Sequence, residues 1–190
     1  MWNTPNLLTL LRIILIPVFV VVFYLETHWA PYAAALIFSE AALTDWLDGY
    51  LARRWGQTSP LGAFLDPVAD KLMVAVALVL LVEADPRAWL ALPAIVIIGR
   101  EITVSALREW MAEIGARAQV AVSAVGKFKT TAQMVSIILL LLHDSVLGPL
   151  VYFPGLVLLY AAAVLTLWSM VIYLRAAWPS LSGQGRNGHR

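Results

Sequence analysis

The sequence contains no cysteine, so neither a disulfide framework nor a thiolate metal ligand is possible. Charged residues are also scarce: they make up 13% of the 190 residues, against roughly 25% in average soluble proteins. The net charge is only +1, which gives no reason to expect a nucleic-acid partner. Any bound metal would therefore need oxygen or histidine ligands, and most of the chain is predicted to lie in an apolar environment.

Hydrophobic residues take the place of the missing charges. They form 61% of the chain and recur in long apolar runs separated by short polar breaks. A helix needs about 20 predominantly apolar residues to cross the hydrocarbon core of a bilayer. The sequence therefore predicts an all-α, polytopic membrane protein with six transmembrane helices, over residues 6–25, 30–52, 61–82, 88–112, 119–142 and 150–177.

The positions of lysine and arginine predict how these helices are oriented. If the N-terminus is cytoplasmic, twelve of the thirteen basic residues lie on or near the cytoplasmic side, and Arg87 alone lies outside. This asymmetry agrees with the positive-inside rule. We therefore expect a multi-pass protein of a bacterial-type inner membrane with both termini in the cytoplasm. Residues 1–181 would form the transmembrane domain, and the polar residues 182–190 a disordered cytoplasmic tail.

Four aspartates interrupt the second and third predicted helices. Asp45 and Asp48 are three residues apart, and Asp66 and Asp70 are four apart, so each pair shares one helical face. A charge in the middle of a membrane helix costs at least about 2.5–3.5 kcal/mol and persists mainly where function or pairing requires it. Four neighbouring carboxylates would repel one another unless cations neutralised them. Without cysteine or nearby histidine, the pattern predicts a site for Mg²⁺ or Mn²⁺.

Other interpretations of the aspartates remain. They could lie at helix ends and extend to the interface, or pair with Arg53, Arg54 and Lys71. Two pairs on adjacent helices, joined by a short loop that holds them at similar depth, favour the metal site. A divalent-cation transporter would also need carboxylates in the membrane. Transporters often contain an internal repeat, but the aspartate pairs are not repeated later in the sequence.

The aspartates belong to a longer pattern. Residues 45–70, DWLDGYLARRWGQTSPLGAFLDPVAD, follow D-x-x-D-G-x-x-A-R, then eight residues, then G-x-x-x-D-x-x-x-D. This pattern resembles the signature of the CDP-alcohol phosphotransferase family. Pro5, Asn6, Thr9 and Arg12, in PNLLTLLR, resemble the beginning of that family's first helix. The predicted length of six helices also agrees with the family, so the resemblance covers nearly the whole chain. All eight fixed positions are present: Asp45, Asp48, Gly49, Ala52, Arg53, Gly62, Asp66 and Asp70.

This resemblance implies a homodimeric enzyme that transfers the phosphatidyl group of CDP-diacylglycerol to an alcohol and releases CMP. It implies two divalent ions. Asp45, Asp48 and Asp66 would hold one ion, and Asp45, Asp66 and Asp70 the other. Asp70 would also be the base for the acceptor hydroxyl, in a site that opens toward the cytoplasm. The residues expected around the cytidine diphosphate are Asn6, Thr9, Gly49, Ala52, Arg53, Ser59 and Gly62.

Basic residues in the second half of the chain bear on the acceptor alcohol. Arg100 and Arg108 are eight residues apart and lie nearly on one face, whereas Lys127 and Lys129 are two apart and do not share one. Glu101 could neutralise one arginine. A cationic pocket of these four basic residues fits an acceptor that carries its own phosphate. The positive-inside rule alone would also place basic residues here.

Two segments sharpen the choice of acceptor by resemblance. Residues 99–109, GREITVSALRE, and 126–134, GKFKTTAQM, resemble the branch of the family whose acceptor is glycerol 3-phosphate. The product would then be phosphatidylglycerol phosphate. Inositol phosphate, a cardiolipin-type acceptor and serine remain as alternatives. The basic residues disfavour serine, because its own ammonium group would be repelled.

Overall fold

The chain forms six helices and no strand in the part that the computed structural model describes, which is residues 4–55, 60–113 and 124–181. Within these ranges the side chains of residues 4–8, 45–55, 60–64, 66, 124–127, 176, 177 and 179–181 are not described. The predicted tail, 182–190, lies outside the described residues. The helices are α1 (Thr4–Phe23), α2 (Ala30–Trp55), α3 (Pro60–Ala84), α4 (Ala88–Glu113), α5 (Ala124–Leu141) and α6 (Gly148–Leu181).

The predicted all-α class and the number of helices are confirmed. Two helices in the described part of the chain, α4 and the segment Gly148–Arg175 of α6, are long and apolar enough to cross a membrane. Shorter apolar helical segments occur at Thr9–Phe23 and Phe128–Leu141. A membrane protein is therefore indicated, and six complete spans stay a prediction.

Proline marks the beginning of most of these helices. Pro5, Pro31, Pro60 and Pro149 lie in the first turns of α1, α2, α3 and α6. A first-turn N–H has no partner within the helix, so its absence costs nothing there, and the fixed φ of proline suits a helix. Pro86 lies just before α4. The sequence therefore contains a local reason for each of these helix starts.

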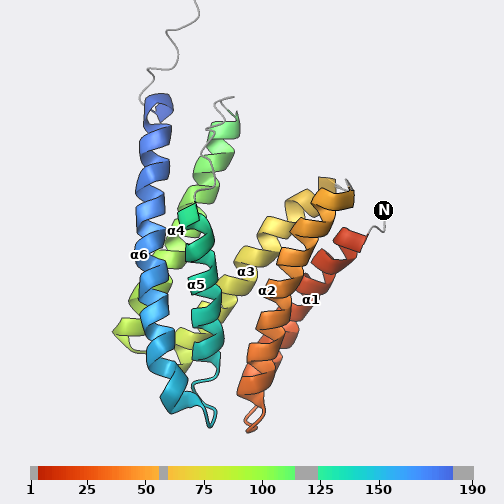
Figure 1. Cartoon of the computed structure of the whole chain (residues 1–190), viewed down its shortest axis with the longest axis vertical. Coiled ribbons are helices and arrows are strands. Elements are labelled where there is room, and N and C mark those ends of the chain that lie inside the picture. The colour runs from red at the N-terminus through yellow and green to blue at the C-terminus, as the bar shows by residue number, and fades with distance from the viewer. Residues whose placement is uncertain (1–3, 56–59, 114–123, 182–190) are drawn as a thin grey trace, which may run out of the picture.

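The helices pack as two groups of three, α1 to α3 and α4 to α6 (Figure 1). The most extensive contacts are between α5 and α6 and between α1 and α2, and the groups meet mainly through α2 with α5 and α3 with α4. One apolar core runs through all six helices. Each helix contributes a fully buried side chain to it: Phe19, Phe38, Leu78, Ile97, Ile137 and Leu159.

The three turns at residues 24–29, 85–87 and 142–147 lie at one end of the bundle (Figure 1). The aspartate pattern occupies the end of α2 and the beginning of α3, toward the opposite end. The C-terminal half of α4, which contains Arg108, and the beginning of α5, which contains Lys127 and Lys129, also lie toward that opposite end, whereas Arg100 belongs to the middle of α4. Most of the segments that carry the predicted site residues therefore lie toward the same end of the bundle (Figure 1).

A polar cluster at the other end joins the turn before α4 to the beginning of α6; we call it the turn cluster, formed by Asp85, Arg87, Trp89 and Tyr152. The Asp85 carboxylate accepts hydrogen bonds from Arg87 Nε, from Arg87 Nη2 at 2.5 Å and from the Tyr152 hydroxyl at 2.5 Å. Trp89 Nε1 donates to the Tyr152 hydroxyl at 3.0 Å. The Arg87 guanidinium lies 4.6 Å from the centre of the Trp89 ring. Arg87, the basic residue predicted on the outer side, is therefore neutralised in place.

Asp85→Asn is expected to lower the free energy of unfolding by about 1–3 kcal/mol, because charge-assisted hydrogen bonds are lost. Hydrogen bonds from Arg87, opposed by burial and aided by Tyr152, hold the pKa of Asp85 below its ordinary value of 3.8. Since the pKa is lower in the folded state, the stabilisation is complete above about pH 5, decreases as the pH falls through the unfolded value, and is lost as the pH falls through the folded pKa.

Thermal unfolding of the detergent-solubilised protein between pH 6 and pH 3 measures this effect. The wild type should lose more stability on acidification than Asp85→Asn does. Glu26→Gln is the control, because Glu26 is an exposed carboxylate in a turn at the same end. If the wild type and Asp85→Asn lose the same stability on acidification, the ionised Asp85 carboxylate does not stabilise the fold through the turn cluster.

Candidate active site

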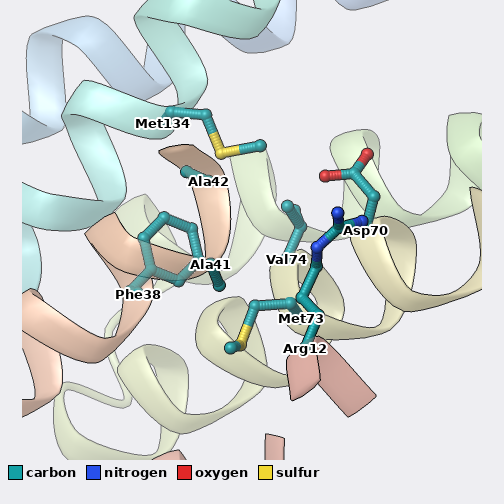
Figure 2. Close-up of a pocket in the computed structure, with 8 residues that line it drawn as sticks. All are labelled: Arg12, Phe38, Ala41, Ala42, Asp70, Met73, Val74 and Met134. Carbon is teal, nitrogen blue, oxygen red and sulfur yellow. The ribbon is translucent and has the colours of Figure 1, made fainter. Parts of the chain in front are cut away.

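A small pocket brings together a buried arginine of α1 and the last aspartate of the predicted signature. Arg12 and Asp70 both line it, and Figure 2 shows the Arg12 side chain extending to the side of the pocket where Asp70 lies. Arg12 is only 1% exposed. Burying a guanidinium is costly unless opposite charge and hydrogen bonds compensate its lost hydration. The remaining lining residues, from α2, α3 and α5, are Phe38, Ala41, Ala42, Met73, Val74 and Met134.

The backbone places the aspartate pattern on two helices that contact each other. Asp45 and Asp48 belong to the last turns of α2, and Asp66 and Asp70 to the first half of α3. Pro67 lies between the second pair. It has no N–H, so the Ala63 carbonyl lacks its usual helical partner.

The structure does not describe most of the side chains that were predicted to form the site. This applies to three of the four aspartates, Asp45, Asp48 and Asp66, whereas Asp70 is described and half-buried. Among the side chains that are described, no three histidines or carboxylates gather as a metal site. The four-aspartate metal site therefore stays a prediction. The other predicted residues outside the described set are Asn6, Gly49, Ala52, Arg53, Ser59, Gly62 and Lys127.

Two of the predicted phosphate-binding residues meet on one carboxylate. Glu101 Oε1 lies 2.6 Å from Arg100 Nη1 and 3.1 Å from Lys129 Nζ. The side chains of the two cations are 10% and 8% exposed, respectively, and that of Glu101 is 24% exposed. The sequence indicated that Glu101 could neutralise one arginine. The structure shows that the same carboxylate oxygen also contacts Lys129 of α5.

Both arginines of α4 also contact α6. Arg100 Nη2 donates to the Ser169 hydroxyl at 3.3 Å, and Arg108 Nη2 donates to the Tyr173 hydroxyl at 2.9 Å. The Arg108 guanidinium lies 5.1 Å from the centre of the Tyr173 ring, within the range of a cation–π interaction. The two guanidinium groups therefore extend toward the same neighbouring helix, as their spacing of eight residues suggested.

A lysine next to Asp70 connects α3 to α4. Lys71 Nζ donates to the Ser105 hydroxyl at 2.5 Å, and that hydroxyl donates to the Glu101 carbonyl at 2.7 Å. The segment that carries Asp70 is thus tied to the helix that carries the basic residues. From the sequence, Lys71 was considered as a partner of the aspartates; the structure pairs it with a serine.

Some residues at this end were not singled out for a role from the sequence. Ser169 and Tyr173 lie in the long apolar helix α6, and neither carries a charge that would draw attention. The sequence did contain an indication that Arg12 is functional, because a charged residue within a hydrophobic helix is costly and persists mainly where function or pairing requires it. The burial of Arg12 beside Asp70 is the observation that connects it to the site.

The described residues form a six-helix bundle in which the aspartate pattern lies on two contacting helices and the buried Arg12 lines a pocket with Asp70. The family model for CDP-alcohol phosphatidyltransferases matches residues 2–171. The chain belongs to this family and is a phosphatidyltransferase. The family match confirms the predicted resemblance, and it shows that the protein is an enzyme rather than the alternative, a cation transporter.

Several bacterial relatives are similar over nearly their whole length. Three of them are each 58% identical to this chain over 183 residues. They come from Escherichia coli (strain K12), Shigella sonnei (strain Ss046) and Shigella boydii serotype 4 (strain Sb227). The match covers 96% of this chain and 99% of each relative. Each relative is named CDP-diacylglycerol--glycerol-3-phosphate 3-phosphatidyltransferase.

Proposed function

We propose that the protein transfers the phosphatidyl group of CDP-diacylglycerol to a hydroxyl of glycerol 3-phosphate, in phospholipid biosynthesis. The products would be phosphatidylglycerol phosphate and CMP. The observation that carries this proposal is the 58% identity, over 96% of the chain, to relatives named for that reaction. The grouping of Arg100, Arg108 and Lys129 supports a phosphorylated acceptor, since guanidinium and ammonium groups bind phosphate through charge-assisted hydrogen bonds.

Two divalent cations, Mg²⁺ or Mn²⁺, would be held by Asp45, Asp48, Asp66 and Asp70. The donor set fits these ions, because they prefer carboxylate oxygens. Asp70 is half-buried and lines a pocket between helices, where a carboxylate is partly shielded from water. When bound, the ions would stabilise charge on the entering and leaving oxygens of the displacement.

The protein's own groups would do the remaining work. Asp70 would accept the proton of the acceptor hydroxyl, which has a high pKa and needs a positioned base as the new P–O bond forms. Arg53 would donate hydrogen bonds to the diphosphate from both arms of its guanidinium. The other residues proposed around the cytidine diphosphate are Asn6, Thr9, Gly49, Ala52, Ser59 and Gly62. Of these, Thr9 is buried on α1, three residues before Arg12.

The acceptor phosphate would lie on the other side of the reacting centre, near α4, α5 and α6. Arg100, Arg108, Lys127 and Lys129 would surround it. Lys71, the residue after Asp70 on α3, donates a hydrogen bond to Ser105 of α4, which lies between Arg100 and Arg108 in the sequence. The acceptor hydroxyl could therefore reach Asp70 while its phosphate is held by cations on neighbouring helices.

We also propose that all six helices cross the inner membrane, with the active site and both termini in the cytoplasm, and that the protein is a homodimer. Residues 1–181 would form one transmembrane domain. Large apolar side chains are exposed on every helix, which suits a surface that faces lipid or a second subunit. Examples from α1 to α6 are Val21, Leu36, Val79, Ile95, Phe128 and Val164.

The test is CMP release by the purified protein in detergent with CDP-diacylglycerol and Mg²⁺. Glycerol 3-phosphate, inositol phosphate and serine are compared as acceptors. We expect release with glycerol 3-phosphate alone, loss of release in EDTA, and recovery when Mg²⁺ or Mn²⁺ is added back. Release with another acceptor would keep the chemistry and overturn the substrate, and release without divalent ions would overturn the metal site.

Arg108→Ala is expected to raise the KM for glycerol 3-phosphate about 10- to 100-fold, the equivalent of one charge-assisted hydrogen bond. The KM for CDP-diacylglycerol should stay nearly unchanged, because Arg108 lies with the basic residues of α4 and not with the signature. Steady-state kinetics with each substrate varied in turn measures both constants. Arg175→Ala, which removes an exposed arginine of α6, is the control. Equal increases in both constants would contradict the assignment of Arg108.

A further inference from the structure

An acidic residue lies at the centre of the basic group. Glu101 is in α4, and one of its oxygens contacts Arg100 of the same helix and Lys129 of α5. Arg100 is in turn bonded to Ser169 of α6. The contacts thus form a chain, from Ser169 to Arg100 to Glu101 to Lys129, that runs across three helices.

The charges of this group match those of a phosphate monoester. Among the described side chains, Arg100, Arg108 and Lys129 contribute three positive charges and Glu101 one negative charge, which leaves a net charge of +2. A phosphate monoester carries a charge of about −1.5 to −2 at neutral pH. The carboxylate therefore reduces the charge of the group without removing its attraction for the acceptor.

The carboxylate also controls where the lysine lies. The contacting nitrogens of Arg100 and Lys129 are no more than about 6 Å apart, because both touch the same oxygen, and like charges at that distance repel strongly in a poorly hydrated site. A lysine side chain has four flexible carbons and can swing away from a neighbouring cation. Without the carboxylate, nothing among the described contacts of Lys129 would keep its ammonium beside α4.

We propose that Glu101 is a positioning residue for the acceptor: it holds the Lys129 ammonium at the acceptor site, and Arg100, anchored on Ser169, holds Glu101. This inference rests on the proposed function. One donor of the ammonium points to Glu101, and the other two are directed to the phosphate. Arg100 uses Nη1 for Glu101 and Nη2 for Ser169, so it contributes mainly charge and the orientation of the carboxylate.

A different role for Glu101 predicts the opposite result. If the carboxylate only competed with the acceptor phosphate for the two cations, its removal would strengthen acceptor binding and lower the KM. A positioning role predicts that the KM rises, although one negative charge has been removed. The sign of the change therefore distinguishes the two roles.

The experiment compares Glu101→Gln, Lys129→Met and the double variant in the CMP-release assay. Glu101→Gln should raise the KM for glycerol 3-phosphate about tenfold, equivalent to about 1.4 kcal/mol, and change the KM for CDP-diacylglycerol less than about twofold. Because Glu101 acts through Lys129, the double variant should be no worse than Lys129→Met alone. A lowered or unchanged KM for Glu101→Gln, or additive effects in the double variant, would overturn the proposal.

Glu113→Gln is the matched control, since it removes the same charge from an exposed position at the end of α4, and its kinetics should equal those of the wild type. If Glu101→Gln does not fold, Glu101→Asp provides the test. It keeps the charge but shortens the side chain, so the KM for glycerol 3-phosphate should still rise, and an unchanged value would overturn the proposal. Wild-type protein that turns over no glycerol 3-phosphate would overturn the proposed function itself, together with this inference.

Discussion

Replacing Asp70 with asparagine is expected to lower kcat by about 10³-fold or more, since a positioned base contributes about 10²–10⁴-fold and a metal ligand is lost as well. Asparagine has nearly the same size, but its amide cannot take the acceptor proton. One of the two proposed metal ions has no contact with Asp70, so CDP-diacylglycerol should still bind. CMP release measures turnover, and retention of radiolabelled CDP-diacylglycerol by the detergent-solubilised variant measures binding.

Asp144→Asn is the control for this variant. It makes the same chemical change in an exposed aspartate of the α5–α6 turn, at the other end of the bundle. Its turnover should equal that of the wild type. Full activity of Asp70→Asn would remove Asp70 as the base, and parallel loss of turnover and lipid binding would make Asp70 a substrate-binding residue instead.

Replacing Arg12 with methionine is expected to lower kcat/KM by about 100-fold or more. In a poorly hydrated pocket, the electrostatic attraction between a guanidinium and a negatively charged substrate group is much stronger than it is in water. Arg12 is 1% exposed and lines the pocket that contains Asp70. Methionine fills a similar volume without charge. The pocket would then be more negative, and a diphosphate would be repelled.

The variants of Arg12 also separate catalysis from folding. Removing one partner of a buried ionic contact costs about 3–5 kcal/mol, so Arg12→Met should unfold at a lower temperature than the wild type. Its activity is therefore compared at a temperature at which thermal unfolding shows that the variant is folded. Arg12→Lys keeps the charge but loses the planar fork of donors, and it should recover part of the activity. Wild-type activity in Arg12→Met would mean that Arg12 is a structural charge with no part in the reaction.

The architecture was largely predictable because its signals are local. Apolar runs of helical length, separated by short polar breaks, predicted the number and order of the helices, which the structure confirms for the described residues. Within the described residues the largest difference is at the end of α6, which was expected at residue 177 and lies at Leu181. The expected beginning of the fifth helix, residue 119, lies outside the described residues.

The sequence by itself determined the family, since the spacing of the aspartates and glycines from 45 to 70 is a chemical pattern that needs no coordinates. It also determined which residues share a helical face, as with Arg100 and Arg108. The tertiary structure decided what those faces meet: Tyr173 for Arg108, Lys129 for Glu101 and the Asp70 pocket for Arg12. The reason is physical. Periodicity places a side chain around its own helix axis, but its partners depend on how separate helices pack.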